Sequence, residues 1–148
     1  MPEAAFRTPV DILLVEDNPN DALLLERVLE GSRLRKTIHV VASGEEALRF
    51  LHRETPYEQA PRPRLVLLDL HLPGLSGLDV LRAMQQDPLL RAIPVVMLTV
   101  SSVREDVLAA YDEGAWAFIT KPGDPVEFEV VIQAIDAFWL ETAQLPAD

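Results

Sequence analysis

Five short apolar runs alternate with stretches of helical spacing along this chain, and this alternation limits the possible folds more than any other feature. The runs are Asp11–Val15, Thr37–Val41, Arg64–Asp69, Pro94–Thr99 and Ala117–Thr120. Runs that are continuously apolar, rather than alternating, are typical of strands buried on both faces of a parallel sheet. Strands that alternate with helices form βαβ crossovers. The sequence therefore predicts an α/β fold, a doubly wound (βα)5 three-layer sandwich.

The stretches between the runs carry helix signals. Apolar pairs recur at i, i+4 spacing, as in Leu25 and Leu29 or Val80 and Met84. Capping residues precede the expected helices, and glycines follow two of them. The starts are Asn18-Pro19, Ser43 with Glu46, Ser102 with Glu105 and Asp124-Pro125 with Glu127, and the glycines are Gly31 and Gly114. Five helices are expected, and the turn-rich segment Glu54–Arg64 is interpreted as an extended loop.

Composition excludes several classes of protein. The 148 residues fit one domain, without low-complexity or repeated segments. The net charge of −11 argues against a general affinity for nucleic acid or anionic lipid. There is no cysteine, no apolar run of about 20 residues and no visible secretory signal, so a cytoplasmic location is expected. The histidines lack the spacing of a zinc site.

Polar residues end four of the five apolar runs. Ligands of an open parallel sheet bind beyond the carboxyl ends of its strands. The residues there are Glu16 and Asp17 after the first run, Asp69 in the third, Thr99 in the fourth and Lys121 after the fifth. In a flavodoxin-like strand order, 2-1-3-4-5, the first and third strands are neighbours. This order is expected to bring the three carboxylates to one place, with Thr99 and Lys121 beside them.

Three crowded carboxylates repel one another, so a positive group is expected among them. Mg²⁺ is the simplest candidate for this positive group, because it takes oxygen ligands and needs only one or two carboxylates with waters and a phosphate. Lys121 adds an ammonium suited to a phosphate oxygen. A carboxylate in such surroundings is a candidate nucleophile toward phosphorus. We therefore expect an acyl phosphate on Asp69, with the Thr99 hydroxyl bonding a phosphoryl oxygen.

Each of these residues also has a simpler interpretation when taken alone. Glu16 and Asp17 are compatible with a solvated loop pair. Asp69 is compatible with a helix N-cap and Thr99 with an ordinary β-branched strand residue. Lys121 is compatible with a surface position. The combination at successive strand ends favours the chemical interpretation.

Four segments in order give the chain a family resemblance. They are "VEDN" (Val15–Asn18), "LLDLHLPGLSG" (Leu67–Gly77), "MLT" (Met97–Thr99) and "EGAWAFITKP" (Glu113–Pro122). Together they closely resemble the receiver domain of two-component response regulators, over a core from about residue 11 to about 138. The resemblance implies a CheY-like fold and a phosphorelay function, with a sensor histidine kinase as the partner and Mg²⁺ as the cofactor. Because nothing follows Asp148, no output domain is expected.

The resemblance also implies a role for each matching residue. Asp69 falls on the phospho-accepting aspartate, and Glu16 and Asp17 fall on the acidic pair that binds metal, Asp17 directly and Glu16 mainly through water. The backbone carbonyl of His71 is implied as a further metal ligand. Thr99 and Lys121 match the switch hydroxyl and the active-site lysine, and Phe118 matches an aromatic rotamer switch. Tyrosine is common at the position of Phe118, so a switch that depends on a phenol hydroxyl is in question.

A narrower resemblance is carried by "LLRAIPVVMLT", the "VREDVLAAYDEGA" segment and the tail "VVIQAIDAFWLETAQLP". These segments look like the single-domain response regulators that pair with phytochrome histidine kinases. Such regulators commonly form homodimers through the fourth helix, the fifth strand and the C-terminal helix. The apolar arc of the tail and its pair Phe138-Trp139 fit either a core contact or such an interface.

Three other functions compete with that of a phospho-acceptor. A phosphorylation-independent interaction or dimerisation module on the same fold predicts losses among Asp17, Asp69, Thr99 and Lys121, yet all four are present. A haloacid-dehalogenase-type hydrolase predicts a second aspartate two residues after the nucleophile, where His71 stands. A flavodoxin-type role predicts a Ser/Thr/Gly-rich phosphate loop after the first strand, where acidic residues stand instead.

Overall fold

The central sheet is parallel throughout and has the predicted strand order. The computed structural model describes residues 10–30, 36–99 and 104–120, with positions 126, 129–130 and 133–134. Its strands are β1 (Val10–Val15), β2 (Lys36–Val41), β3 (Leu65–Asp69), β4 (Val95–Thr99) and β5 (Ala117–Thr120). They follow the order β2-β1-β3-β4-β5. The predicted α/β class and topology are confirmed, and each strand begins within one residue of its predicted run.

Four helices lie within the described ranges. They are α2 (Pro19–Glu30), α3 (Gly44–Leu51), α4 (Gly77–Gln85) and α5 (Arg104–Asp112). The fifth predicted helix falls mostly outside the described residues, although positions 126, 129–130 and 133–134 within it are helical. In the part of the chain that the structure describes, no helix is both long and apolar enough to cross a membrane.

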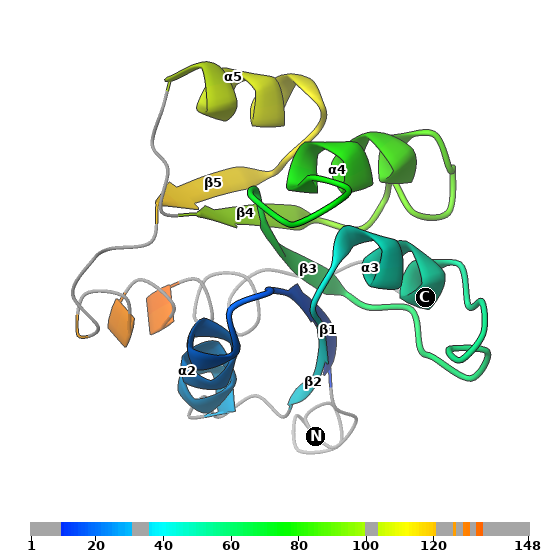
Figure 1. The fold of residues 1–148 in the computed structure, drawn as a ribbon, viewed down its shortest axis with the longest axis horizontal. Coiled ribbons are helices and arrows are strands. Elements are labelled where there is room, and N and C mark those ends of the chain that lie inside the picture. The colour runs from blue at the N-terminus through cyan, green and yellow to red at the C-terminus, as the bar shows by residue number, and fades with distance from the viewer. Residues whose placement is uncertain are drawn as a thin grey trace, which may run out of the picture.

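The helices divide between the two faces of the sheet (Figure 1). Helix α2 packs on one face through Leu25 and Leu29, which are buried with Ile12 and Leu14 of β1. Helices α3, α4 and α5 cover the other face, where Leu13 and Val15 meet residues such as Met84. Because successive strand residues point to opposite faces, each central strand contributes to both cores. This burial on both sides explains why the sequences of β3 and β4 are continuous apolar runs.

Polar side chains cap the N-termini of the helices largely where the sequence predicts. Asn18 Oδ1 accepts hydrogen bonds from the backbone N–H groups of Asn20 and Asp21, at 2.9 and 3.2 Å. Ser43 Oγ accepts from the Glu46 N–H at 3.1 Å. Helix α4 has a full capping box between Ser76 and Asp79, which the sequence analysis did not predict. The expected caps at Ser102 and Asp124 and the helix end at Gly31 lie outside the described residues.

Candidate functional site

The ends of β1 and β3 place two acidic residues side by side. Val15 pairs with Leu68 in the register of these neighbouring strands, so Glu16 and Asp69 follow at the same level. By strand alternation, both belong to the face that carries Ile12 and Leu14. Since parallel strands end at one edge of a sheet, chain topology alone brings together carboxylates that are 53 positions apart in the sequence.

Glu16, Asp17 and Asp69 form a compact carboxylate cluster. Each offers one oxygen, and these oxygens all lie within 4.8 Å of one another. Glu16 is 3% and Asp69 8% exposed, whereas Asp17 is exposed. Negative charges this close repel, and burial of two of them reduces the screening by water. The donor set consists only of oxygens and keeps one side open to solvent, which fits a hard divalent cation that retains several waters.

Backbone donors orient two of the carboxylates. The Asn18 N–H donates to Glu16 Oε2 at 3.2 Å, and the His71 N–H donates to Asp69 Oδ1 at 3.0 Å. Both bonds link residues two positions apart, so each strand-end loop holds its own carboxylate. The loops therefore present carboxylate oxygens already fixed in direction.

A hollow of about 210 Å³ lies over this cluster. Its lining unites five of the predicted site residues with two others: Glu16, Asp17, Asn18, Asp21, Asp69, His71 and Thr99. Thr99 is 1% exposed at the end of β4. The hollow is thus lined by carboxylates, an amide and a hydroxyl, which are groups that bind a cation or a phosphoryl oxygen.

Lys121 directly follows β5, which pairs with β4 through Thr99 and Thr120. Lys121 itself lies outside the described residues, as do Pro122 and the aromatic pair Phe138-Trp139. The role expected of Lys121 therefore stays a prediction.

Phe118 lies on β5 opposite Met97 of β4. It is partly buried and packs against the core beneath α3, α4 and α5. Its backbone N–H donates to the hydroxyl of Tyr111, on α5, at 3.2 Å. A phenol is thus present beside Phe118, although it comes from the neighbouring helix.

Two features of the site were missed by sequence reasoning. Asp21 lines the hollow, and its spacing of four residues after Asp17, at the start of a helix, was the available signal. The side chain of His71 lies 3.7 Å from Asp106 of α5, measured from Nε2 to Oδ2. No residue pattern near His71 predicts this second contact, because it joins a loop to a helix far along the chain. The expected role of the His71 carbonyl remains untested.

Comparisons with known proteins agree with this geometry. The family model "Response regulator receiver domain" matches residues 12–133. The response regulator Rcp1 of Synechocystis sp. is 41% identical over 139 residues, which cover 94% of this chain and 95% of Rcp1.

Solved structures are similar over the same length. The Mn²⁺-bound form of Rcp1 matches with a TM-score of 0.91 at 41% identity, over 94% of this chain and 100% of that one. The phosphorylated cyanobacterial phytochrome response regulator RcpA matches with a TM-score of 0.92 at 38% identity, over 95% and 100% of the two chains. With its strand order, its acidic cluster and these matches, the chain belongs to the family of response regulator receiver domains.

Proposed function

We propose that this protein is a phospho-accepting regulator of a two-component phosphorelay, and that Asp69 takes the phosphoryl group from a histidine kinase. The observation that carries the proposal is the position of Asp69. It is 8% exposed at the end of a buried strand and has an oxygen within 4.8 Å of those of Glu16 and Asp17. A purely structural role gives no reason to gather three carboxylates at one edge of the sheet, because negative charges this close repel one another.

The proposed reaction is a transfer between two protein side chains. A carboxylate oxygen of Asp69 attacks phosphorus, the P–N bond of the kinase phosphohistidine breaks, and the released imidazole takes up a proton. The carboxylate cluster would hold Mg²⁺, which supplies positive charge to the transferring phosphoryl oxygens. Asp17 would bind this ion directly and Glu16 mainly through water. The His71 N–H holds Asp69 in place by a hydrogen bond, and Lys121 is proposed to add its ammonium. The receiver thus assists its own phosphorylation and slow dephosphorylation without being an enzyme for other substrates.

The signal is proposed to pass from Asp69 to the opposite edge of the sheet. Thr99 lines the same hollow and can bond a new phosphoryl oxygen. Its movement would leave space toward Phe118, on the adjacent strand β5. An inward turn of Phe118 would repack the surface of α5, β5 and the C-terminal helix, and shift an existing two-state equilibrium.

The kinase partner is proposed to be a phytochrome or a related sensor. Support comes from the similarity to RcpA, which is described as a phytochrome response regulator and whose structure is phosphorylated. The similarity to the Mn²⁺-bound form of Rcp1 supports a divalent cation at the carboxylate cluster. Both relatives match across nearly their full length.

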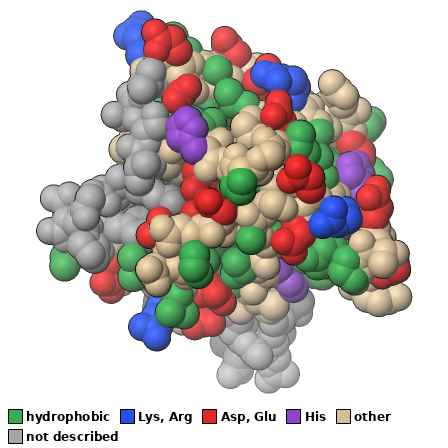
Figure 2. All heavy atoms as spheres, in the orientation of Figure 1, with side chains coloured by type: hydrophobic (Ala, Val, Ile, Leu, Met, Phe, Trp, Pro, Cys, Tyr) green, Lys and Arg blue, Asp and Glu red, His purple; other side chains and the backbone are tan. Residues whose placement is uncertain are grey.

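A homodimer is proposed through α5, β5 and the C-terminal helix. Leu108 and Tyr111, one turn apart on α5, are 50% and 48% exposed, and Trp116, which directly precedes β5, is 50% exposed; exposed apolar side chains that gather on one surface mark interaction sites. The protein is further proposed to act in the cytoplasm without contacting nucleic acid. Acidic side chains are spread across the face shown in Figure 2, whereas basic ones are few, and such a surface repels phosphates.

A mass measurement tests the central proposal. Incubation with acetyl phosphate and Mg²⁺ should add one phosphoryl group to the wild type and none to Asp69→Asn, whose amide is not a nucleophile. Beryllofluoride should bind the wild type and mimic the phosphorylated state. A wild type that gains no mass would instead favour a phosphorylation-independent interaction module on the same fold.

A further inference from the structure

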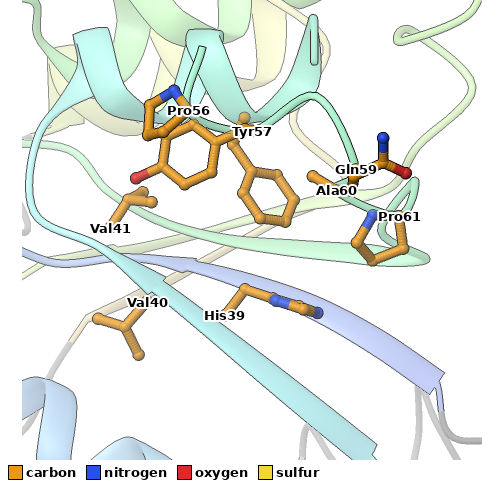
Figure 3. A pocket seen from close by; sticks show the side chains of 9 residues that line it. His39, Val40, Val41, Pro56, Tyr57, Gln59, Ala60 and Pro61 are labelled. Atoms are coloured by element: carbon orange, nitrogen blue, oxygen red, sulfur yellow. The ribbon is translucent and has the colours of Figure 1, made fainter. Parts of the chain in front are cut away.

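A second hollow lies at the open edge of the sheet, beside strand β2. Its volume is about 380 Å³, within the range of roughly 300 to 1,000 Å³ that is typical of ligand pockets. Strand β2 forms its floor, and the loop after α3 forms its roof (Figure 3). The extended loop predicted at Glu54–Arg64 is therefore one wall of a pocket.

Among the described residues, no strand pairs with the outer side of β2. The Val41 carbonyl accepts a hydrogen bond from the Glu16 N–H, so Val41 directs its backbone groups toward β1. In a parallel strand such groups alternate in direction from one residue to the next, so those of Val40 and Ile38 point to the outer edge. An outermost strand of this kind is a template for an added strand. The side chain of Val40, 39% exposed, points to the face away from the pocket (Figure 3).

Aromatic rings give the pocket rigid apolar walls. The ring of Phe50 lies 5.2 Å from that of His39 and 5.4 Å from that of Tyr57, between centroids. Pro56, Ala60 and Pro61 add further apolar surface from the loop. Figure 3 shows the Tyr57 ring above the strand, with His39 on β2 below it. The hollow that these rings and the loop residues line suits an aliphatic side chain that enters from the strand edge.

Two carboxylates lie beside the pocket. Asp11 Oδ1 accepts a hydrogen bond from His39 Nε2 at 3.0 Å, and Glu46 Oε2 accepts one from the Tyr57 hydroxyl. No lysine or arginine is among the described residues that line the pocket. The hydrogen bond to Glu46 raises the pKa of Tyr57, and this effect exceeds the opposing effect of Arg49. A cationic group beside the apolar anchor would therefore meet complementary charge.

We propose that β2 and this pocket bind an extended peptide segment of a partner protein, which adds to the sheet as a sixth strand. The segment carries an aliphatic side chain that enters the pocket and a lysine or arginine two residues further on the same face, near Asp11 or Glu46. Strand addition of this kind draws its affinity from main-chain hydrogen bonds and its specificity from the pocket. The surface lies on β2, not at the carboxylate hollow, so binding should not require phosphorylation.

A blocked hexapeptide, acetyl-Thr-Leu-Thr-Arg-Thr-Arg-amide, is a suitable probe. It should bind the ¹⁵N-labelled protein with a dissociation constant on the order of 1 mM or lower and shift the amide signals of β2 and of the loop after α3. N-methylation of one alternate set of its amides should weaken binding about tenfold or more, while methylation of the other set should not. Exchange of both arginines for glutamate should also weaken binding.

A variant tests the same contact from the side of the protein. Val40→Pro removes an outward N–H that the sheet does not use, and proline is tolerated on edge strands. It should weaken binding of the probe about tenfold, whereas Leu89→Ser, at an exposed position after α4, should leave the affinity unchanged. The proposal is overturned if the probe shifts signals of α5 and β5 instead, or if both N-methylated peptides bind equally. It is also overturned if Val40→Pro turns a dimer into a monomer, since β2 would then pair with a second copy.

Discussion

The backbone of Asp69 packs closely against Gly77, a residue without a side chain. Gly77 begins α4, and its N–H donates to the Leu70 carbonyl at 2.9 Å. A Cβ atom at Gly77 would lie 2.4 Å from the carbonyl oxygen of Asp69, which is backbone that cannot move aside easily. The reactive carboxylate thus depends on a close approach between its own backbone and the first turn of the next helix.

Gly77→Ala should therefore disturb both stability and phosphorylation. Displacement of the Asp69 backbone is expected to cost about 1 to 3 kcal/mol in the free energy of unfolding, measured with urea. The folded fraction should also accept phosphate from acetyl phosphate more slowly. Gly114→Ala is the control, because its φ of +100° strains alanine at the end of α5, far from Asp69 along the chain. If the two variants lose stability but keep equal phosphorylation rates, the coupling to Asp69 is wrong.

Asp17 should contribute more to cation binding than its neighbour Asp21. Both line the hollow, but only Asp17 belongs to the carboxylate cluster. Asp17→Ala is expected to weaken Mg²⁺ binding at least about tenfold, measured by titration calorimetry, because a direct ligand is lost. Asp21→Ala removes the same charge and should have a smaller effect. Equal affinities in the wild type and Asp17→Ala would contradict the ligand assignment.

Helix α4 begins with a partly exposed capping box whose strength depends on pH. The Ser76 N–H donates to Asp79 Oδ2 at 3.0 Å, and the Asp79 N–H donates to Ser76 Oγ at 3.1 Å. The bond from the Ser76 backbone is the main reason that the pKa of Asp79 lies below its ordinary value of 3.8. The folded state therefore favours the ionised carboxylate.

The contribution of Asp79 to stability should accordingly disappear in acid. It is fully present above the pKa of the unfolded state and is lost as the pH falls through the lower pKa of the folded state. Urea unfolding of the wild type and Asp79→Asn should differ at about pH 6 and converge toward about pH 3 and below. Arg82→Gln is the control, because Arg82 contacts Asp79 at 3.4 Å without taking part in the cap. A difference that persists unchanged at low pH would rule out the carboxylate as its source.

The molecule as a whole presents an apolar surface near α5 and an acidic hollow at the strand ends. The surface contains Leu108, Tyr111 and Trp116, about half exposed each, and it belongs to the face covered by α5. His71 reaches from the loop beside Asp69 to Asp106 on the same helix. The contact of His71 with Asp106 therefore connects the hollow to the apolar surface through α5. The pairing of β4 with β5 provides a second connection.

Removal of the apolar surface should dissociate the proposed dimer. Leu108→Ser combined with Trp116→Ser is expected to give a monomer by size exclusion with light scattering, because burial of these side chains would drive association. Leu23→Ser is the control, since Leu23 is 48% exposed on α2, on the other face of the sheet. Measurements with and without beryllofluoride would show whether phosphorylation strengthens the dimer. Association that is unchanged in the double variant would place the interface elsewhere.

Local patterns were sufficient for much of the fold. The bounds of β3 and β4 follow from runs that only two-sided burial explains, and Asn18 and Ser43 mark helix starts because capping acts within a few residues. The Ser76 cap has a comparable local signal, an acidic residue three positions later at Asp79. The expected second half of the Ser43 capping box is not formed, since Glu46 bonds the Ala42 N–H and the Tyr57 hydroxyl instead.

Residue types and their spacing along the chain determined the fold class, the strand ends and the identity of the acidic residues. These depend on the strand and helix periods and on the oxygen chemistry of carboxylates, both of which can be read locally. The separations within the cluster, the contact of His71 with Asp106 and the pocket beside β2 came only from the folded chain. Each joins residues whose distance is set by strand register and by packing between elements, and neither quantity is encoded in any single short segment.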